Sequence, residues 1–180
     1  MAYTTRKEKN MSKLVAYYSR AGENYFDGEY RRITVGNTEK AAKMLCELSG
    51  AKLFCIEQEV PYSDDYKTCI AQAKEDMKKN ARPKLVSLPE SLDEYDEIYL
   101  GYPNYWGTMP MAVYAFLEHY DFSGKTIHPF CTHEGSGLSS TESDIKKAAR
   151  GATVAKWLAI RGSSVDGAAE LLKNWLKESK

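Results

Sequence analysis

Residues 101–110 carry the side chains best suited to contact a flat, conjugated molecule. The segment is Gly-Tyr-Pro-Asn-Tyr-Trp-Gly-Thr-Met-Pro, with adjacent aromatic rings at Tyr105 and Trp106 and no acid, base or strong nucleophile. Aromatic faces stack on other conjugated rings, whereas hydrolysis needs groups that transfer protons or attack a bond. The composition of this loop therefore favours recognition of a planar ligand over hydrolysis. The alternative interpretation is that the two aromatic rings only pack the turn.

A second loop has the composition of an anion site. Residues 19–22, Ser-Arg-Ala-Gly, are followed by an insert, 23–35, and then by residues 36–38, Gly-Asn-Thr, where a helix is predicted to begin. Backbone N–H groups and the positive end of a helix dipole bind phosphate in such loops. No Walker lysine is present. The simpler interpretation, a helix N-cap formed by Asn and Thr, stays open.

Residues 132–137, Thr-His-Glu-Gly-Ser-Gly, form a third unusual loop. Its small residues would let the backbone approach the edge of a planar ligand and donate N–H groups to that ligand's carbonyls. His133 and Glu134 could be an acid–base pair, but such side chains are more often surface groups of a loop. We therefore predict no catalytic residue.

Each of the three loops follows a predicted strand. Short apolar runs predict strands at 13–19, 51–56, 97–102, 126–132 and 152–160. Helical spacing of apolar residues and turn signals predict helices at 39–48, 69–79, 110–119, 143–150 and 166–177. This alternation predicts an α/β fold, a doubly wound three-layer sandwich whose five parallel strands lie in the order 2-1-3-4-5. In that order, the loops after strands one, three and four converge on one ligand.

Length and charge restrict the classes of function. A chain of 180 residues supports one domain, which we place at 11–180, after a polar lead at 1–10 that we expect to be disordered. Its 25 basic and 25 acidic residues balance, so no global field attracts nucleic acid or an anionic membrane. No apolar run approaches the roughly 20 residues of a membrane-spanning helix.

The cysteines indicate neither a metal site nor a disulfide framework. Cys46, Cys55, Cys69 and Cys131 form no CxxC pair, so we predict no bound metal. Three of them, at positions 46, 55 and 131, lie in apolar runs and are expected to be small buried side chains. A reduced, cytoplasmic protein is the simplest interpretation.

Taken together, the three loops resemble those of the flavodoxin family over about residues 13–177. The match consists of Tyr-Ser-Arg-Ala-Gly at 18–22 with the interrupted Gly-Asn-Thr at 36–38, the aromatic loop at 101–110, and the glycine-rich loop at 132–137. The resemblance implies bound FMN, with its 5′-phosphate on the first loop, its isoalloxazine on the second, and its pyrimidine end or ribityl chain along the third. The cofactor-binding set implied is Ser19, Arg20, Ala21, Asn37, Thr38, Pro103, Asn104, Tyr105, Trp106, Gly107, Thr132, His133, Glu134, Gly135 and Gly137.

The resemblance implies a low-potential electron carrier that meets redox partner proteins transiently. The alternative is an NAD(P)H-dependent FMN oxidoreductase that acts on a quinone or similar acceptor, and a non-redox FMN-binding module is a third class. Aromatic cover from Tyr105 or Trp106 favours the carrier, although the sequence does not say which ring stacks. It also leaves open whether the chain is a monomer or a weak dimer, and whether the insert 23–35 is a flap, a partner surface or a tolerated insertion.

Overall fold

Strands and helices alternate along the chain, as its hydrophobic pattern predicts. The computed structural model describes residues 12–179, so the polar lead predicted at 1–10 lies outside the described residues. The strands are β1 (Ser12–Tyr17), β2 (Gly22–Phe26), β3 (Glu29–Ile33), β4 (Lys52–Cys55), β5 (Tyr95–Pro103), β6 (Thr126–His133), β7 (Thr153–Val154) and β8 (Leu158–Arg161). The helices are α1 (Asn37–Ser49), α2 (Tyr66–Lys78), α3 (Met111–His119), α4 (Thr141–Ala148) and α5 (Ala169–Glu178), with a 3₁₀ turn at Gly162–Gly167.

The main sheet is parallel and confirms the predicted order. Its strands lie in the order β4-β1-β5-β6, and both β7 and β8 pair with the outer edge of β6. The fifth strand is thus split: β7 pairs with the start of β6 at Thr126, and β8 pairs with its end from Phe130 onward. The carboxyl ends of β1, β5 and β6 therefore lie side by side.

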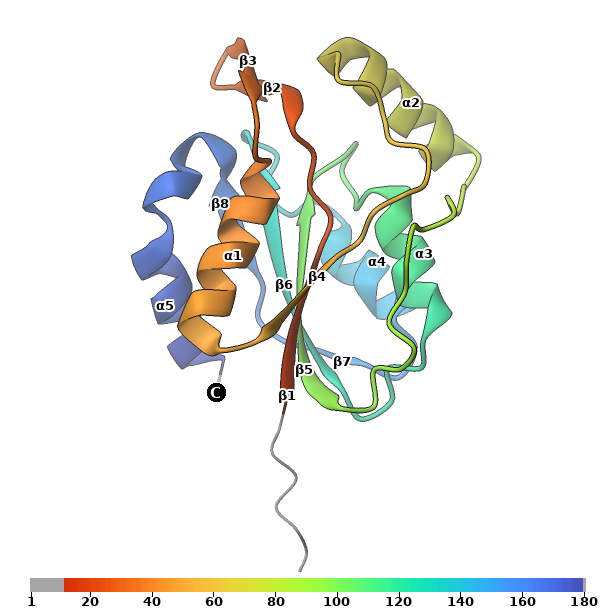
Figure 1. Ribbon diagram of the computed structural model, residues 1–180, viewed down its shortest axis with the longest axis vertical. Helices are drawn as coiled ribbons and strands as arrows, with labels where there is room; N and C mark the ends of the chain where they lie inside the picture. Colours follow the sequence, from red (N-terminus) through yellow and green to blue (C-terminus); the bar gives the residue numbers. More distant parts are fainter. Residues whose placement is uncertain (1–11, 180) are drawn as a thin grey trace, which may run out of the picture.

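Helices cover both faces of this sheet, which makes three layers (Figure 1). Successive residues of β1 point to opposite faces, so Leu14 and Ala16 join one buried cluster while Val15 and Tyr17 join the other. α3 and α4 pack on the first face, and α1 and α5 pack on the second. Burial of β1 on both faces explains its nearly continuous apolar sequence.

Local signals set the ends of two helices that border the site. α1 ends at Gly50, whose φ of 69° is the left-handed conformation that glycine adopts at low cost. α2 begins after Asp65, whose side chain accepts a hydrogen bond of 2.8 Å from the N–H of Thr68. α2 packs against β2 and α3, and Figure 1 shows it projecting beyond the sheet beside the hairpin.

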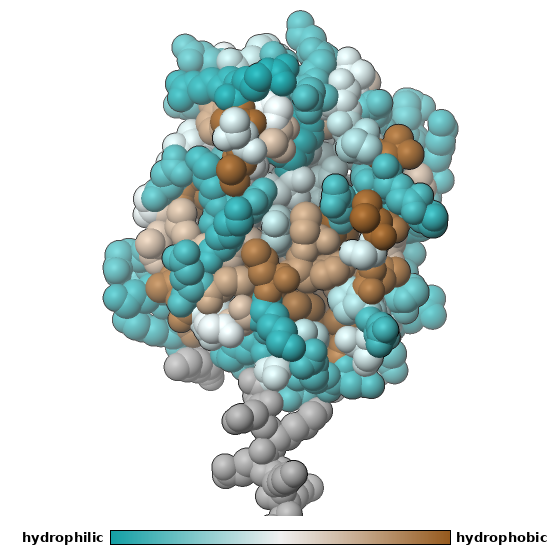
Figure 2. All heavy atoms as spheres, viewed as in Figure 1, coloured by the Kyte–Doolittle hydropathy of each residue, from teal (hydrophilic) through white to brown (hydrophobic). Residues whose placement is uncertain are grey.

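β4 is the edge strand of the sheet and is more exposed than its apolar sequence predicts. Leu53 is 43% exposed, and Figure 2 shows apolar residues gathered across the middle of this face. The expectation that three cysteines are buried holds for Cys131 but is wrong for Cys55, which is exposed on this edge strand. Cys46, near the end of α1, is half-buried.

The insert 23–35 in the first loop folds as an antiparallel hairpin. Gly22 pairs with Ile33 at its base, and the chain reverses at Asp27 and Gly28, which have φ values of 47° and 100°. Asp and Gly tolerate this left-handed conformation, which a two-residue hairpin turn requires. The hairpin forms a small sheet of its own, separate from the main one.

Candidate functional site

The three unusual loops meet around one cavity of about 400 Å³ at the carboxyl ends of β1, β5 and β6. This is the position at which an open α/β sheet binds its ligand. Predicted residues that line the cavity are Ser19, Arg20, Asn37, Thr38, Pro103, Asn104, Tyr105, Trp106, Thr132, His133, Glu134 and Gly135. Ala21, Gly107 and Gly137 were also predicted to contact a ligand, but they do not line the cavity.

At one end of the cavity, small polar side chains surround the start of α1. Ser19 Oγ accepts a hydrogen bond of 3.0 Å from the N–H of Glu39 and so caps the helix from the preceding loop. Thr38 and Thr132 join the first and third loops through a buried hydroxyl–hydroxyl hydrogen bond of 2.7 Å. The partial positive charge of the thirteen-residue helix α1 therefore acts among hydroxyl groups, an arrangement suited to an anion.

Glycine is required where the two halves of the first loop meet. A Cβ atom on Gly36 would lie 2.6 Å from the carbonyl oxygen of Arg20 and would also overlap Ser19 Oγ. Such distances are far below van der Waals contact, so any other residue would force the loop apart. The two parts of the interrupted motif therefore lie next to each other in the structure, with residues 19–20 packed directly on residue 36.

Two buried acceptors near this end have no hydrogen-bond donor among the described residues. They are Asn37 Oδ1 and Glu134 Oε2, although Arg161 Nε lies 3.6 Å from the Glu134 oxygen. Buried acceptors are normally paired. Hydroxyl or N–H groups of a bound molecule would pair them, and FMN carries both kinds of donor, on its ribityl chain and on its ring. The two unpaired acceptors of the cavity therefore fit FMN.

Tyr105 and Trp106 differ sharply in their surroundings, which the sequence could not separate. Tyr105 packs edge-on against Tyr18, with ring centroids 6.2 Å apart, and burial raises the pKa of its phenol well above its usual value. Trp106 is 46% exposed at the rim, where its indole N–H donates to the carbonyl of Ile70 at 2.8 Å. Lys74 Nζ lies 4.5 Å from the centroid of its ring. Trp106 thus offers the larger accessible aromatic surface.

The backbone of the aromatic loop is strained and held by hydrogen bonds. Trp106 has a φ of 54°, a conformation that bulky residues rarely adopt. Asn104 supports it: its side-chain oxygen accepts from the N–H of Gly107 at 3.0 Å, and its side-chain nitrogen donates to the carbonyl of Gly137 at 2.8 Å. Gly107 and Gly137 therefore shape the wall of the cavity from behind.

His133 and Glu134 are engaged within the protein. His133 Nδ1 accepts from the N–H of Gly135 at 2.9 Å, and burial lowers the pKa of this imidazole. Glu134 Oε1 accepts from the N–H of Ser163 at 2.6 Å. The first bond holds the third loop internally, and the second fixes it to the turn that follows β8. Both leave the two side chains poorly placed to act as an acid–base pair.

Arg20 lines the cavity, yet its guanidinium group is directed elsewhere. It donates to the carbonyl of Ser63 at 3.1 and 2.7 Å, to that of Asp64 at 2.8 Å and to that of Glu23 at 2.6 Å. Four of its five N–H donors are therefore used by backbone carbonyls. The expected contact between this side chain and a phosphate is not supported by these bonds.

The inserted hairpin and α2 form a wall of the cavity; a flap was one of the interpretations left open for the insert 23–35, whereas sequence reasoning missed the contribution of α2. Asn24 and Tyr25 reach the cavity from β2, and Tyr66, Cys69, Ile70 and Ala73 reach it from α2. The rings of Tyr25 and Tyr66 stack with centroids 6.3 Å apart. Burial raises the pKa of the Cys69 thiol, so it stays protonated. Ser136 and Gly162 complete the lining residues that were not predicted.

Two further observations concern residues 12–179. Nowhere in this range do three or more His, Cys, Asp or Glu side chains gather as metal ligands would. No helix there is long and apolar enough to cross a membrane.

Comparison with known proteins identifies the family. The family model described as flavodoxin matches residues 29–179. A structure from Bacteroides uniformis ATCC 8492, described as a flavoprotein, is 30% identical, with a TM-score of 0.75 and coverage of 93% of this chain and 98% of that one. A second, from Bacteroides eggerthii DSM 20697, is 25% identical, with a TM-score of 0.67 and coverage of 91% and 98%.

A more distant structure shares the fold. It is a flavoprotein in complex with FMN from Lactobacillus acidophilus NCFM, 21% identical, with a TM-score of 0.62 and coverage of 87% of this chain and 97% of that one. No curated protein matches the sequence. The matched family model spans most of the chain, and the loops, the sheet order and the cavity agree with it: the chain belongs to the flavodoxin family.

Proposed function

We propose that this protein binds FMN in the cavity and carries electrons between partner proteins. Support for the cofactor comes from the family, from the FMN complex of the Lactobacillus acidophilus structure, and from the two unpaired acceptors of the cavity, which the hydroxyl and N–H groups of FMN would pair. Bound FMN supplies the redox chemistry, because its conjugated ring accepts and releases electrons one or two at a time. The protein binds and orients the cofactor and excludes water.

Different parts of the cavity suit different parts of FMN. Ser19, Thr38 and the start of α1 suit the phosphate, because hydroxyl donors and the helix dipole act together there. Trp106 and Tyr105 suit the ring, because they are the aromatic groups on the loop at the end of β5. The third loop, from Thr132 to Gly135, suits the polar edge of the ring and the ribityl chain.

One observation carries the choice of an electron carrier: the titratable groups that line the cavity are engaged or neutral. His133 and Glu134 accept backbone hydrogen bonds, and burial keeps Cys69 and Tyr105 protonated. Among the described residues, the cavity thus offers surfaces and hydrogen bonds rather than a general base or a nucleophile. Electron transfer through FMN needs nothing more from the protein.

The oxidoreductase remains the second candidate on the strength of a different observation. The third-loop side of the cavity is lined by His133, Glu134, Gly135 and Ser136, without a phenylalanine, tyrosine or tryptophan. A wall without these large aromatic rings leaves more room beside a planar ligand. Such room would suit a nicotinamide or a quinone.

Reconstitution separates the two candidates. The protein is purified, mixed with FMN and freed of excess flavin; retention of the yellow flavin absorbance supports cofactor binding, and a colourless protein refutes it. The holoprotein is then mixed without oxygen with dithionite or with NADPH. Bleaching by dithionite alone supports the carrier. Rapid bleaching by NADPH, with turnover on a quinone, would replace the carrier with the oxidoreductase.

A further inference from the structure

The β2–β3 hairpin covers part of the cavity but has little hydrophobic support of its own. It contributes Asn24 and Tyr25 to the cavity lining. Phe26 is its one buried side chain, and Tyr30 on the facing strand is 52% exposed. A two-stranded hairpin is at best marginally stable in isolation. Its position over the cavity therefore depends on how it is attached to the rest of the protein.

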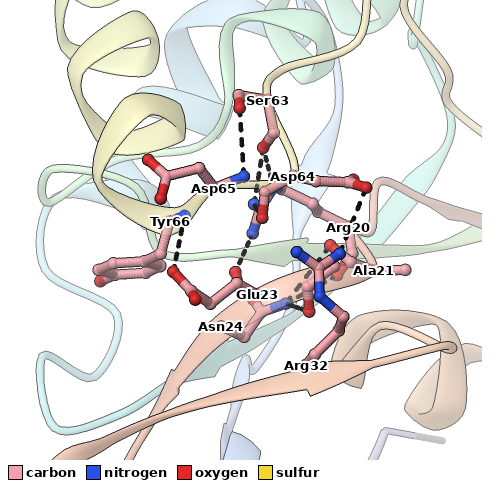
Figure 3. A network of polar contacts seen from close by, with 10 residues as sticks. Arg20, Ala21, Glu23, Asn24, Arg32, Ser63, Asp64, Asp65 and Tyr66 are labelled. Carbon is pink, nitrogen blue, oxygen red and sulfur yellow. Dashed lines mark hydrogen bonds and ion pairs between the residues drawn. The ribbon is translucent and has the colours of Figure 1, made fainter.

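Arg20 is the centre of the attachment on the α2 side, as Figure 3 shows. Its guanidinium joins the carbonyl of Glu23, at the base of the hairpin, to the carbonyls of Ser63 and Asp64, which precede α2. A planar guanidinium donates several bonds in a fixed fork, which a lysine ammonium cannot reproduce. One side chain thus fastens the hairpin to the segment that begins α2.

Further backbone and side-chain contacts reinforce this attachment. The N–H of Glu23 donates to the carbonyl of Asp64 at 3.0 Å, and Glu23 Oε1 accepts from the N–H of Tyr66 at 3.2 Å. Gly22 has a φ of 83°, and a Cβ atom there would lie 2.9 Å from Asp64 Oδ1. Arg32 adds an exposed ion pair with Asp64 at 3.5 Å.

A second attachment lies at the tip of the hairpin. Asp27 Oδ1 pairs with Arg161 at the end of β8 at 2.6 Å. Arg161 also lies 3.6 Å from Glu134 Oε2, on the third loop of the cavity. The hairpin therefore spans the cavity, attached to α2 on one side and to β8 on the other.

We propose that the hairpin is a strap that retains FMN, and that Arg20 is a positioning residue that latches it. This inference rests on the proposed binding of FMN. Arg20 then controls the rate at which the whole flavin dissociates and does not bind the phosphate. The two roles make opposite predictions for riboflavin, which has the same ring and ribityl chain but no phosphate.

The test compares Arg20→Lys and Arg20→Ala with the unaltered protein, using FMN and riboflavin as ligands. Dissociation is followed by the recovery of flavin fluorescence after dilution. A latch predicts at least a tenfold faster release of both flavins in both variants, because lysine keeps the charge but not the fork. A phosphate ligand predicts a selective loss of FMN in Arg20→Ala and its retention in Arg20→Lys, and that result would overturn the proposal.

Two further variants keep the test decisive if substitution of Arg20 impairs folding. Asp27→Gly removes the tip attachment but keeps a residue that tolerates the turn, and it should speed the release of both flavins. Arg31→Gln is the matched control, because the contacts of Arg31 with Glu29 and with the ring of Phe26 both lie inside the hairpin. Unchanged release in Asp27→Gly, or equal acceleration in Arg31→Gln, contradicts the strap. Failure of the unaltered protein to retain FMN would instead refute the proposed function.

Discussion

The hydrogen bond between Thr38 and Thr132 gives a sharp test of how the first and third loops are joined. Both side chains are nearly inaccessible, at 1% and 4% exposed, and their hydroxyl oxygens lie 2.7 Å apart. Thr38→Val removes one hydroxyl and leaves the other buried without its partner, which costs about 1–3 kcal/mol. Thr132→Val should cost a similar amount for the same reason.

The double variant distinguishes a shared bond from two independent sites. When both hydroxyl groups are replaced by methyl groups, no polar atom of this pair is left unsatisfied, so the total loss should be close to that of one single variant. The free energy of unfolding is measured by urea denaturation of the apoprotein. Thr153→Val, on an exposed position of β7, is the control and should change stability by no more than about 0.5 kcal/mol.

Additive losses in the double variant would refute the bond. A sum near 4 kcal/mol, from about 2 kcal/mol for each hydroxyl, would mean that each one has its own partner. If the bond exists, FMN affinity should also fall in the single variants, because the start of α1 and the end of β6 are no longer held together. Fluorescence titration with FMN measures that fall.

Three other predictions follow from single sites. Burial lowers the pKa of His128 below the ordinary histidine value of about 6.5. The free energy of unfolding should therefore be highest above that pH and should decrease as the pH falls below it. Urea denaturation at several pH values should show a weaker pH dependence in His128→Phe. Gly36→Ala should cost about 1–3 kcal/mol and weaken FMN binding, because its Cβ meets the carbonyl of Arg20; an unaltered urea midpoint would contradict this close approach. Trp106→Phe removes the bond to the carbonyl of Ile70 and should reduce FMN affinity about threefold to thirtyfold, measured by quenching of flavin fluorescence; an unchanged affinity would show that neither the larger indole ring nor this bond contributes to binding.

Much of the fold follows from local patterns in the sequence. Apolar runs at 13–19 and 97–102 predict buried strands, and the structure has β1 and β5 over most of these positions. The alternation of such strands with amphipathic helices predicts the parallel sheet, and the parallel sheet brings the ends of β1, β5 and β6 together. Loop composition could then be assigned to one cavity, because the topology leaves the three loops a single place to meet.

What the sequence could not supply depends on contacts between distant residues. A helix was predicted near 69–79, but its place beside the cavity results from packing on β2 and α3, which no local pattern records. An arginine in a loop with the composition of a phosphate-binding loop is expected to bind an anion, because its side chain is positively charged. Three of the four hydrogen bonds that Arg20 donates go to the carbonyls of Ser63 and Asp64, more than forty positions away. Likewise, Cys55 lies in an apolar run, but its strand is at the edge of the sheet.

The way the hairpin closes on itself explains how a ligand loop can tolerate a long insertion. Gly22 and Ile33 are paired at its base, so the chain leaves the loop and returns to nearly the same point. Residues 19–20 can then pack on Gly36 as sequence neighbours would. Lengthening a loop costs little closure entropy in any case, about 0.6 kcal/mol for each doubling. The first loop is therefore modular: a hairpin of different length or surface could replace this one and leave the packing of residues 19–20 on Gly36 in place.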